Sequence, residues 1–291
     1  MAGRGLTTLA LLLAALLACG GQGDQIRRRY ERVGASPPPD GPRAVGPIAS
    51  KGSGTLQLGA TTARVEALDQ SIDDDAPANV VSRAMFHAGY HHGVTPGLEL
   101  GGALMFAHTG SGKRLASDTP SDRLDDSLYW GTALSVRGVF TEDEVFFLVG
   151  ITELSLWMLP YHERASESVN GDPFALEGEG SKRLDYFQLR GGLSPGVRVG
   201  PMLSVAAGAL LQGYPVFQSA TELAACDPNC TADAEEPTVF GFVTTPFAWA
   251  SFTPGRLSVS LQVFANVGAT HRLSGAVPYG GTLALGYRLG R

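Results

Sequence analysis

Residues 256–268 read RLSVSLQVFANVG, and this stretch decides between two kinds of fold. Apolar side chains occupy every second position from Leu257 to Val267, and they alternate with residues such as Ser260 and Gln262. This period of two predicts a β-strand with one apolar face and one more polar face. In a soluble protein the apolar face packs on a core, whereas in a transmembrane barrel it contacts lipid and the polar face lines the lumen. Strand length and the connections decide between them.

Ten segments of this kind follow one another along the sequence. The predicted strands are residues 54–68, 80–92, 97–109, 127–141, 144–158, 184–199, 201–214, 238–253, 255–270 and 279–291. Each is at least as long as the ~9–11 residues that a tilted transmembrane strand needs. Strands of soluble proteins are usually nearer ~5–6 residues. Strand length therefore favours the membrane.

The connections alternate between short and long. Short turns follow the second, fourth, sixth and eighth strands, with the sequences GVTP, ED, GP and PG. Long polar stretches follow the first, third, fifth and seventh strands. Transmembrane barrels have this asymmetry, with short periplasmic turns and longer outer loops. An even number of strands then predicts that both chain termini lie on the periplasmic side.

The composition agrees with a barrel. Charged residues make up 17% of the chain, against ~25% in typical soluble domains. Glycine accounts for 38 of the 291 residues, which suits crowded and bent strands. The net charge of −6 gives no indication of nucleic-acid binding, and no motif points to a cofactor.

The N-terminus, MAGRGLTTLALLLAALLACGG, has the features of a secretory signal peptide. Arg4 precedes an apolar run, Leu6 to Ala18, that is too short to span a bilayer. The run ends in Leu-Leu-Ala-Cys, which resembles the lipobox of bacterial lipoproteins, and this resemblance implies that Cys19 is lipidated. The Pro- and Gly-rich residues 19–53 then predict a lipidated linker outside the barrel.

Two further cysteines lie close together in the sequence AACDPNCTA. An Asp-Pro-Asn turn between Cys226 and Cys230 brings the two thiols near one another, and an exported protein meets an oxidising compartment. We therefore predict a disulfide between them.

Charged side chains on the predicted strands are expected to face the lumen, since an Arg facing lipid costs about 2–4 kcal/mol near the middle of the bilayer. The residues predicted to line the lumen are Arg83, Glu99, Arg137, Glu153, Arg190, Gln262 and Arg288. They either line a narrow passage for small solutes or pair across the lumen and fill it. His87 and His91 would lie ~13 Å apart on one strand, which predicts no metal site.

The last residues, TLALGYRLGR, resemble the terminal strand of bacterial outer-membrane β-barrels, although the chain ends in Gly-Arg instead of an aromatic residue. This resemblance, over 54–291, implies an all-β, closed, antiparallel up-and-down barrel that contacts the lipid bilayer of the outer membrane. The predicted organisation is a signal peptide (1–18), a linker (19–53) and the barrel (54–291). The expected function is a narrow channel or a scaffold with exposed loops and no enzymatic activity. The alternatives are a rim-active hydrolase, omptin-like or lipid-modifying, and a soluble lipocalin-like periplasmic lipoprotein.

Overall fold

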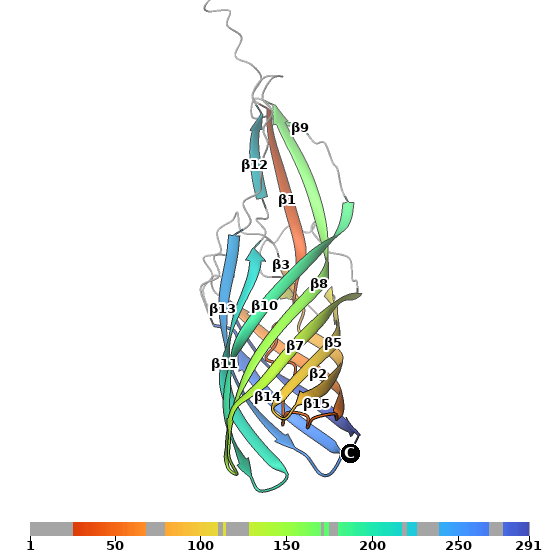
Figure 1. Cartoon of the computed structure of the whole chain (residues 1–291). Coiled ribbons are helices and arrows are strands. Elements are labelled where there is room, and N and C mark those ends of the chain that lie inside the picture. Colours follow the sequence, from red (N-terminus) through yellow and green to blue (C-terminus); the bar gives the residue numbers. More distant parts are fainter. Residues whose placement is uncertain are drawn as a thin grey trace, which may run out of the picture.

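Ten long strands form a closed antiparallel barrel in the computed structural model, as Figure 1 shows. The structure describes residues 26–67, 79–109, 113–114, 128–169, 172–174, 180–216, 220–225, 239–267 and 276–290. The barrel strands are β2 (Gly54–Ala67), β4 (Ala84–Thr95), β5 (Leu98–His108), β7 (Leu128–Glu142), β8 (Phe146–Val169), β10 (Gly180–Val199), β11 (Leu203–Val216), β13 (Val239–Phe252), β14 (Leu257–Ala265) and β15 (Ala276–Leu289). Each pairs with the next in this order, and β15 pairs with β2 to close the barrel.

The predicted fold class is confirmed, and all ten predicted strands are present. The largest difference is at β8, which we predicted to end at residue 158 but which continues to Val169. Its last part, YHERASESV, is polar and carries no apolar alternation, because it extends beyond the barrel wall and pairs with another segment there. Among the described residues, no helix is long and apolar enough to cross a membrane.

The two faces of the strands point as predicted, with apolar side chains outward. In β14, Leu261 is 59% exposed on the outer face, whereas the neighbouring Gln262 is only 1% exposed on the inner face. Leu257, Val259 and Val263 are exposed on the same side as Leu261. A soluble lipocalin-like barrel would have the opposite arrangement, so this alternative does not fit the structure.

Four short turns lie at one end of the barrel, which we call the short-turn end and which is at the bottom of Figure 1. Gly97 and Gly200 lie in two of these turns with φ of 91° and 71°, a conformation that side chains other than glycine rarely adopt. In the turn between β7 and β8, the Asp143 carboxylate accepts hydrogen bonds from the backbone N–H groups of Phe146 and Val145. These two hydrogen bonds lower the pKa of Asp143 below its usual value.

The opposite, long-loop end carries additional strands. They are β1 (Ile26–Ser36), β3 (Asn79–Val81), β6 (Lys113–Arg114), β9 (Asp172–Phe174) and β12 (Ala220–Ala225). Of these, β1, β9 and β12 rise above the barrel in Figure 1. The largest of them, β1, pairs antiparallel with the extension of β8 on one side and with β12 on the other. This end of the molecule is therefore built partly from the N-terminal region.

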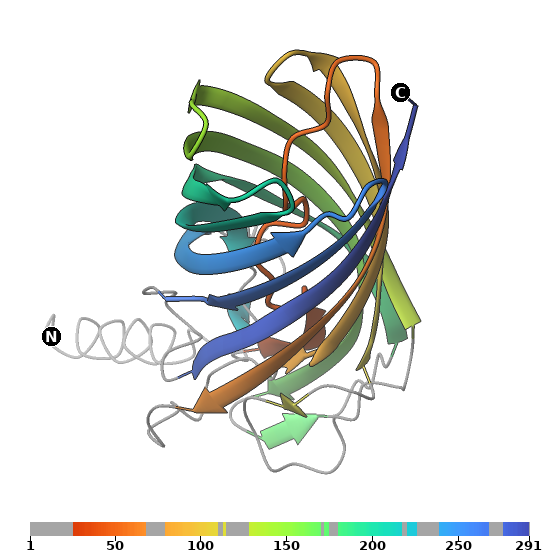
Figure 2. The same cartoon turned by 90° about the horizontal axis from the view of Figure 1, so that it is seen from below.

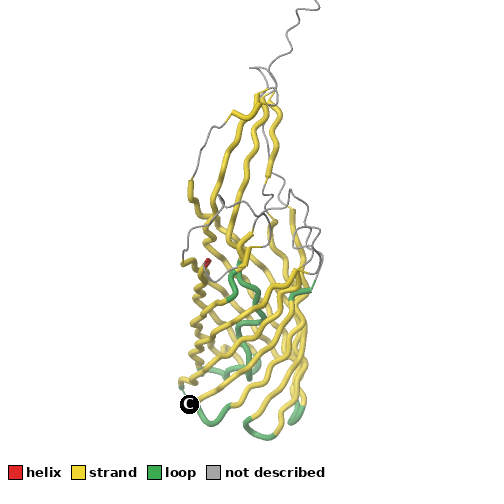
Figure 3. The backbone as a smooth tube through the Cα atoms, turned by 180° about the vertical axis from the view of Figure 1, so that it is seen from behind, coloured by secondary structure: helices red, strands yellow, loops and turns green. Residues whose placement is uncertain are grey.

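Residues 26–53 do not form an external linker, which corrects our prediction for this part of residues 19–53, whereas residues 19–25 lie outside the described residues. After β1, residues 37–53 run through the interior of the barrel to the start of β2, as Figure 2 shows from the short-turn end and Figure 3 from behind. We call residues 37–53 the luminal segment. The sequence did not reveal this path, because a Pro- and Gly-rich stretch without periodicity has the same composition inside a barrel as outside one.

The two ends of the described chain consequently lie at opposite ends of the barrel, and residues 1–25, to which the expectation of shared termini applies, lie outside the described residues. Ile26 pairs with Val169 at the tip of the β8 extension, whereas Leu289 pairs with Gly54 at the short-turn end. The even strand count places Gly54 and Leu289 together, as expected. The luminal segment then carries the preceding chain back to the long-loop end.

Apolar side chains on the inner face fill much of the remaining lumen. One cluster gathers near the long-loop end around Met85, Met105 and Trp157, each at most 1% exposed. A second cluster includes Phe147 and Phe247, with Val45 and Ile48 of the luminal segment packed against it. The luminal segment is thus packed into the apolar interior of the barrel.

Candidate functional site in the lumen

The backbone of the luminal segment is held by polar side chains of the barrel wall. Gln57 of β2 donates a hydrogen bond from Nε2 to the carbonyl oxygen of Arg43 at 2.9 Å, and Gln262 of β14 donates to that of Pro42 at 3.2 Å. Proline has no backbone N–H, so a Pro-rich segment brings few donors that need partners in a buried site. Its free carbonyl oxygens can instead accept hydrogen bonds from the wall.

A first ionic cluster joins the luminal segment to β8 and β10. The Arg190 guanidinium contacts both carboxylate oxygens of Asp40, with NH1–Oδ1 at 2.8 Å and NH2–Oδ2 at 3.2 Å. Its Nε also donates to Glu153 Oε2 at 2.5 Å. Arg43 completes the cluster, because its backbone N–H donates to Glu153 Oε1 at 3.0 Å and its NH2 lies 2.8 Å from Asp40 Oδ2.

A second ionic cluster lies nearer the short-turn end. Arg137 of β7 donates from Nε and NH2 to Glu99 Oε1 of β5, at 2.8 and 2.6 Å. Both residues also hold the luminal segment, since Glu99 Oε2 accepts from the Ala49 backbone N–H at 2.7 Å and Arg137 NH1 donates to the Gly46 carbonyl oxygen at 2.9 Å. His91 Nδ1 lies 3.5 Å from Glu99 Oε1.

Charge is balanced across the two clusters. Three carboxylates (Asp40, Glu99 and Glu153) face three guanidinium groups (Arg43, Arg137 and Arg190), and all six side chains are buried. Burying an unpaired charge is very costly, so each group depends on its partners. Removing one partner of a buried ion pair typically destabilises a protein by about 3–5 kcal/mol.

The structure brings together five of the seven residues predicted to line the lumen. Glu99, Arg137, Glu153, Arg190 and Gln262 are buried on the inner face, and each contacts the luminal segment. Arg288 lies farther away, at the short-turn end, where it lines a pocket. Arg83 is placed differently, because it lies at a bend before β4 and its side chain is exposed. The bend interrupts the alternation that predicted its inward direction.

Asp40 and Arg43 are the functional residues that the sequence analysis missed. Both lie in the stretch assigned to a linker, so the alternation rule did not apply to them. The predicted charges gave no signal for Asp40, because Arg137 and Arg190 are already matched in number by Glu99 and Glu153.

Among the described residues, no three or more His, Cys, Asp or Glu side chains form a group that could hold a metal ion. His87 and His91 are both buried on the inner face, while His92 is exposed on the outer face beside Tyr90. Cys19, Cys226 and Cys230 lie outside the described residues, so their lipidation and disulfide remain predictions.

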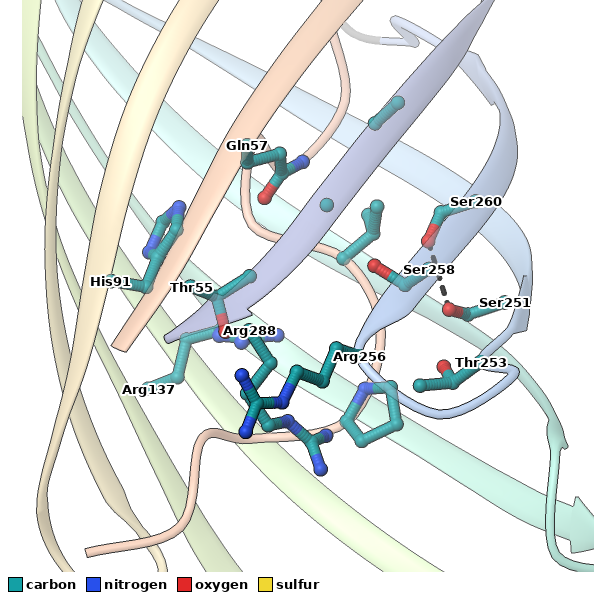
Figure 4. A pocket seen from close by; sticks show the side chains of 14 residues that line it. Thr55, Gln57, His91, Arg137, Ser251, Thr253, Arg256, Ser258, Ser260 and Arg288 are labelled. Carbon is teal, nitrogen blue, oxygen red and sulfur yellow. Dashed lines mark hydrogen bonds between the residues drawn. The ribbon is translucent and has the colours of Figure 1, made fainter. Parts of the chain in front are cut away.

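A small pocket of about 30 Å³ opens at the short-turn end between the luminal segment and strands β2, β13, β14 and β15. Figure 4 shows its polar character: Arg137, Arg256 and Arg288 reach toward it, and the hydroxyl groups of Thr55 and Ser258 line it. Ser260 Oγ and Ser251 Oγ, also on its wall, are hydrogen-bonded at 2.9 Å.

No protein-family profile and no curated protein matches this sequence. Several solved structures are similar in fold. The outer-membrane protease OmpT from Escherichia coli has a TM-score of 0.35 and 10% identity, with 92% of this chain and 98% of that chain covered. LpxR from Salmonella typhimurium has a TM-score of 0.38 and 11% identity, over 80% of this chain and 99% of that chain. The translocator domain of the autotransporter NalP from Neisseria meningitidis has a TM-score of 0.37 and 8% identity, over 98% of this chain and 96% of that chain. At these values the similarity concerns the barrel alone.

The hydrolase alternative rests on acidic and histidine residues near the long-loop rim. Asp125, Asp126 and His271 lie outside the described residues, and His162 belongs to the extension of β8. The side chains on which this alternative depends thus lie outside those that the structure describes.

Proposed function

We propose that this protein is a bacterial outer-membrane β-barrel with a closed lumen, which acts as a membrane-embedded scaffold for the structure at its long-loop end. The proposal has three parts: contact with lipid, the orientation of the barrel, and closure of the lumen by the luminal segment.

The outer surface supports contact with lipid. Large apolar side chains are exposed on strand after strand around the barrel, including Leu58 at 63%, Leu134 at 66% and Leu283 at 51%. A continuous exposed apolar surface of this kind is unfavourable in water and favourable in a bilayer.

The difference between the two ends supports an orientation. In outer-membrane barrels the short turns face the periplasm and the longer loops face outward. Applied to this chain, the rule places Gly54 and Leu289 on the periplasmic side and β1 on the outer side. The chain that precedes Ile26 would then leave the barrel on the outer side as well.

The contacts of the luminal segment support a closed barrel, and the observation that carries this proposal is the ion pair of Asp40 with Arg190. Asp40 comes from the luminal segment, so the pair fixes that segment to the wall inside the barrel. The second cluster fixes it again at Ala49 and Gly46. A channel for small solutes would have to displace all of these contacts.

Conductance in a planar lipid bilayer tests the proposal directly. The native protein should show no steady ion conductance, because the luminal segment and the apolar clusters occupy the lumen. The double variant Asp40→Ala, Arg43→Ala removes the two buried charged side chains of the segment and should produce transient openings. Arg198→Ala is the matched control, because the partly exposed pair of Arg198 with Glu142 lies at the short-turn end and takes no part in the two ionic clusters, so the barrel should stay closed. A steady current through the native protein would contradict a closed lumen.

A further inference from the structure

The pocket at the short-turn end carries a surplus of positive charge. Its wall includes Arg137, Arg256 and Arg288 and no aspartate or glutamate. Arg137 is already neutralised by Glu99. In the part of the chain that the structure describes, no ion pair joins Arg256 or Arg288 to a carboxylate. Arg198 differs in this respect, since it lies at the same end of the barrel and pairs with Glu142.

Backbone pairing holds the two uncompensated arginines next to each other. The Arg288 N–H donates a hydrogen bond to the Arg256 carbonyl oxygen at 2.8 Å, so the two residues are neighbours at the start of β14 and the end of β15. Like charges on neighbouring strands destabilise a sheet. Figure 4 shows both side chains at the wall of the pocket, where Arg256 is exposed and Arg288 is half-buried. A bound anion would remove this repulsion.

Neutral hydrogen-bond donors complete the pocket. Thr55 and Ser258 present hydroxyl groups beside the arginines, and Thr253 Oγ1 is buried without a hydrogen-bond partner among the described residues. Hydroxyl and guanidinium donors together match the oxygen atoms of a phosphate or sulfate group, which an arginine can contact with two parallel hydrogen bonds. The small and mostly polar pocket suits a compact oxyanion of this kind.

We propose that this pocket binds a phosphate group, held by Arg256 and Arg288, at the short-turn mouth of the barrel. Such a group comes either from free inorganic phosphate or a phosphate monoester, or from a phospholipid headgroup. Arg137 supplies additional positive potential, but its hydrogen bonds are already used by Glu99 and by the luminal segment. Neither Arg256 nor Arg288 takes part in the two ionic clusters, so substituting them tests the pocket without removing the ion pairs that hold the luminal segment.

Isothermal titration calorimetry tests the site, with inorganic phosphate as the probe and the full chain in nanodiscs of zwitterionic lipid. The native protein should give saturable binding. The double variant Arg256→Gln, Arg288→Gln should weaken it by about tenfold or more, because it removes both guanidinium groups that hold the phosphate. Arg198→Gln is the matched control at the same end of the barrel and should bind as the native protein does.

Several outcomes decide the proposal. Absence of saturable binding to the native protein, or equal affinity in the double variant, would overturn it. Arg256 lies in an exposed turn, so Arg256→Gln alone serves if the double variant does not fold, as judged by heat-dependent migration in detergent gels. The variant Arg256→Lys, Arg288→Lys keeps the charge and should retain most of the affinity.

Titration with inorganic phosphate in nanodiscs that contain phosphatidic acid separates the two sources of the phosphate group. A reduced apparent affinity for inorganic phosphate identifies a lipid headgroup in the site, and an unchanged affinity identifies free phosphate.

Discussion

Asp40 and Arg190 are 150 residues apart in the sequence and form a two-point ion pair inside the barrel, with oxygen–nitrogen distances of 2.8 and 3.2 Å. The first residue lies in the luminal segment and the second in the barrel wall. Through this contact the N-terminal part of the chain becomes a component of the barrel interior. Folding of the segment and closure of the barrel are therefore expected to be coupled.

Arg190→Gln should lower the free energy of unfolding by about 3–5 kcal/mol, because Asp40 and Glu153 would remain buried with too little positive charge. The measurement is reversible denaturant unfolding in lipid vesicles. The double variant Asp40→Asn, Arg190→Gln should lose less than the sum of the two single losses, since it removes both members of the pair. Arg198→Gln breaks an exposed pair and should cost less than about 1 kcal/mol. Equal losses in Arg190→Gln and this control would show that the luminal pair does not stabilise the fold.

Leu261 and Gln262 are adjacent in β14 and lie on opposite faces, so arginine at each position tests the orientation of the strand. Leu261→Arg should destabilise the barrel by about 2–4 kcal/mol in a bilayer, because the charge would face lipid. Gln262→Arg should also destabilise it, since Gln262 is buried against the luminal segment.

The two variants are distinguished by replacing the lipid around the outer face of the barrel with detergent. In detergent micelles the charge at residue 261 can reach water more easily, so the loss for Leu261→Arg should shrink. The loss for Gln262→Arg should stay the same, because the lumen is unchanged. A loss for Leu261→Arg that is independent of lipid would contradict contact between this face and the membrane.

Lipidation of Cys19 is a prediction with a positional consequence. The residues between Cys19 and Ile26 span at most about 25 Å when extended, and β1 begins at the long-loop end. Acyl chains on Cys19 should therefore lie on the outer side of the membrane and not in the periplasmic leaflet. Mass spectrometry of the mature N-terminus should show the acyl groups, and Cys19→Ser should lack them.

Surface exposure of the same region can be measured separately. An epitope tag placed after Gly20 should be accessible to antibody on intact cells. A tag inserted in the short turn at Gly255 is the matched control and should become accessible only after the outer membrane is permeabilised. The reverse pattern would mean that the barrel is oriented with its short turns outward.

The pair Cys226 and Cys230 should form a disulfide in the connection between β12 and β13. A thiol reagent applied to the unreduced, denatured protein should then label neither cysteine, and prior reduction should expose both. Cys226→Ser provides the control, because it should leave Cys230 reactive without reduction. Labelling of both cysteines in the unreduced native sequence would exclude the disulfide.

Local patterns in the sequence determined the barrel wall. The alternation in residues 256–268 depends only on the chemistry of neighbouring residues and on the period of two that a strand imposes, so it correctly placed Leu261 outside and Gln262 inside. The lengths of the connections likewise determined which strand ends share a side. The extension of β8 had no such signal, because its partner, β1, lies more than a hundred residues away in the sequence.

Only the tertiary structure decided what fills the lumen. Residues 37–53 carry no periodic pattern, and their partners Gln57, Glu99, Arg137, Glu153, Arg190 and Gln262 are distributed over six strands. Those side chains converge only when the ten strands close into a barrel, and a buried charge such as Asp40 is stable only after they have converged. The sequence could identify the inward-facing charges one strand at a time, but closure of the barrel determined which of them meet.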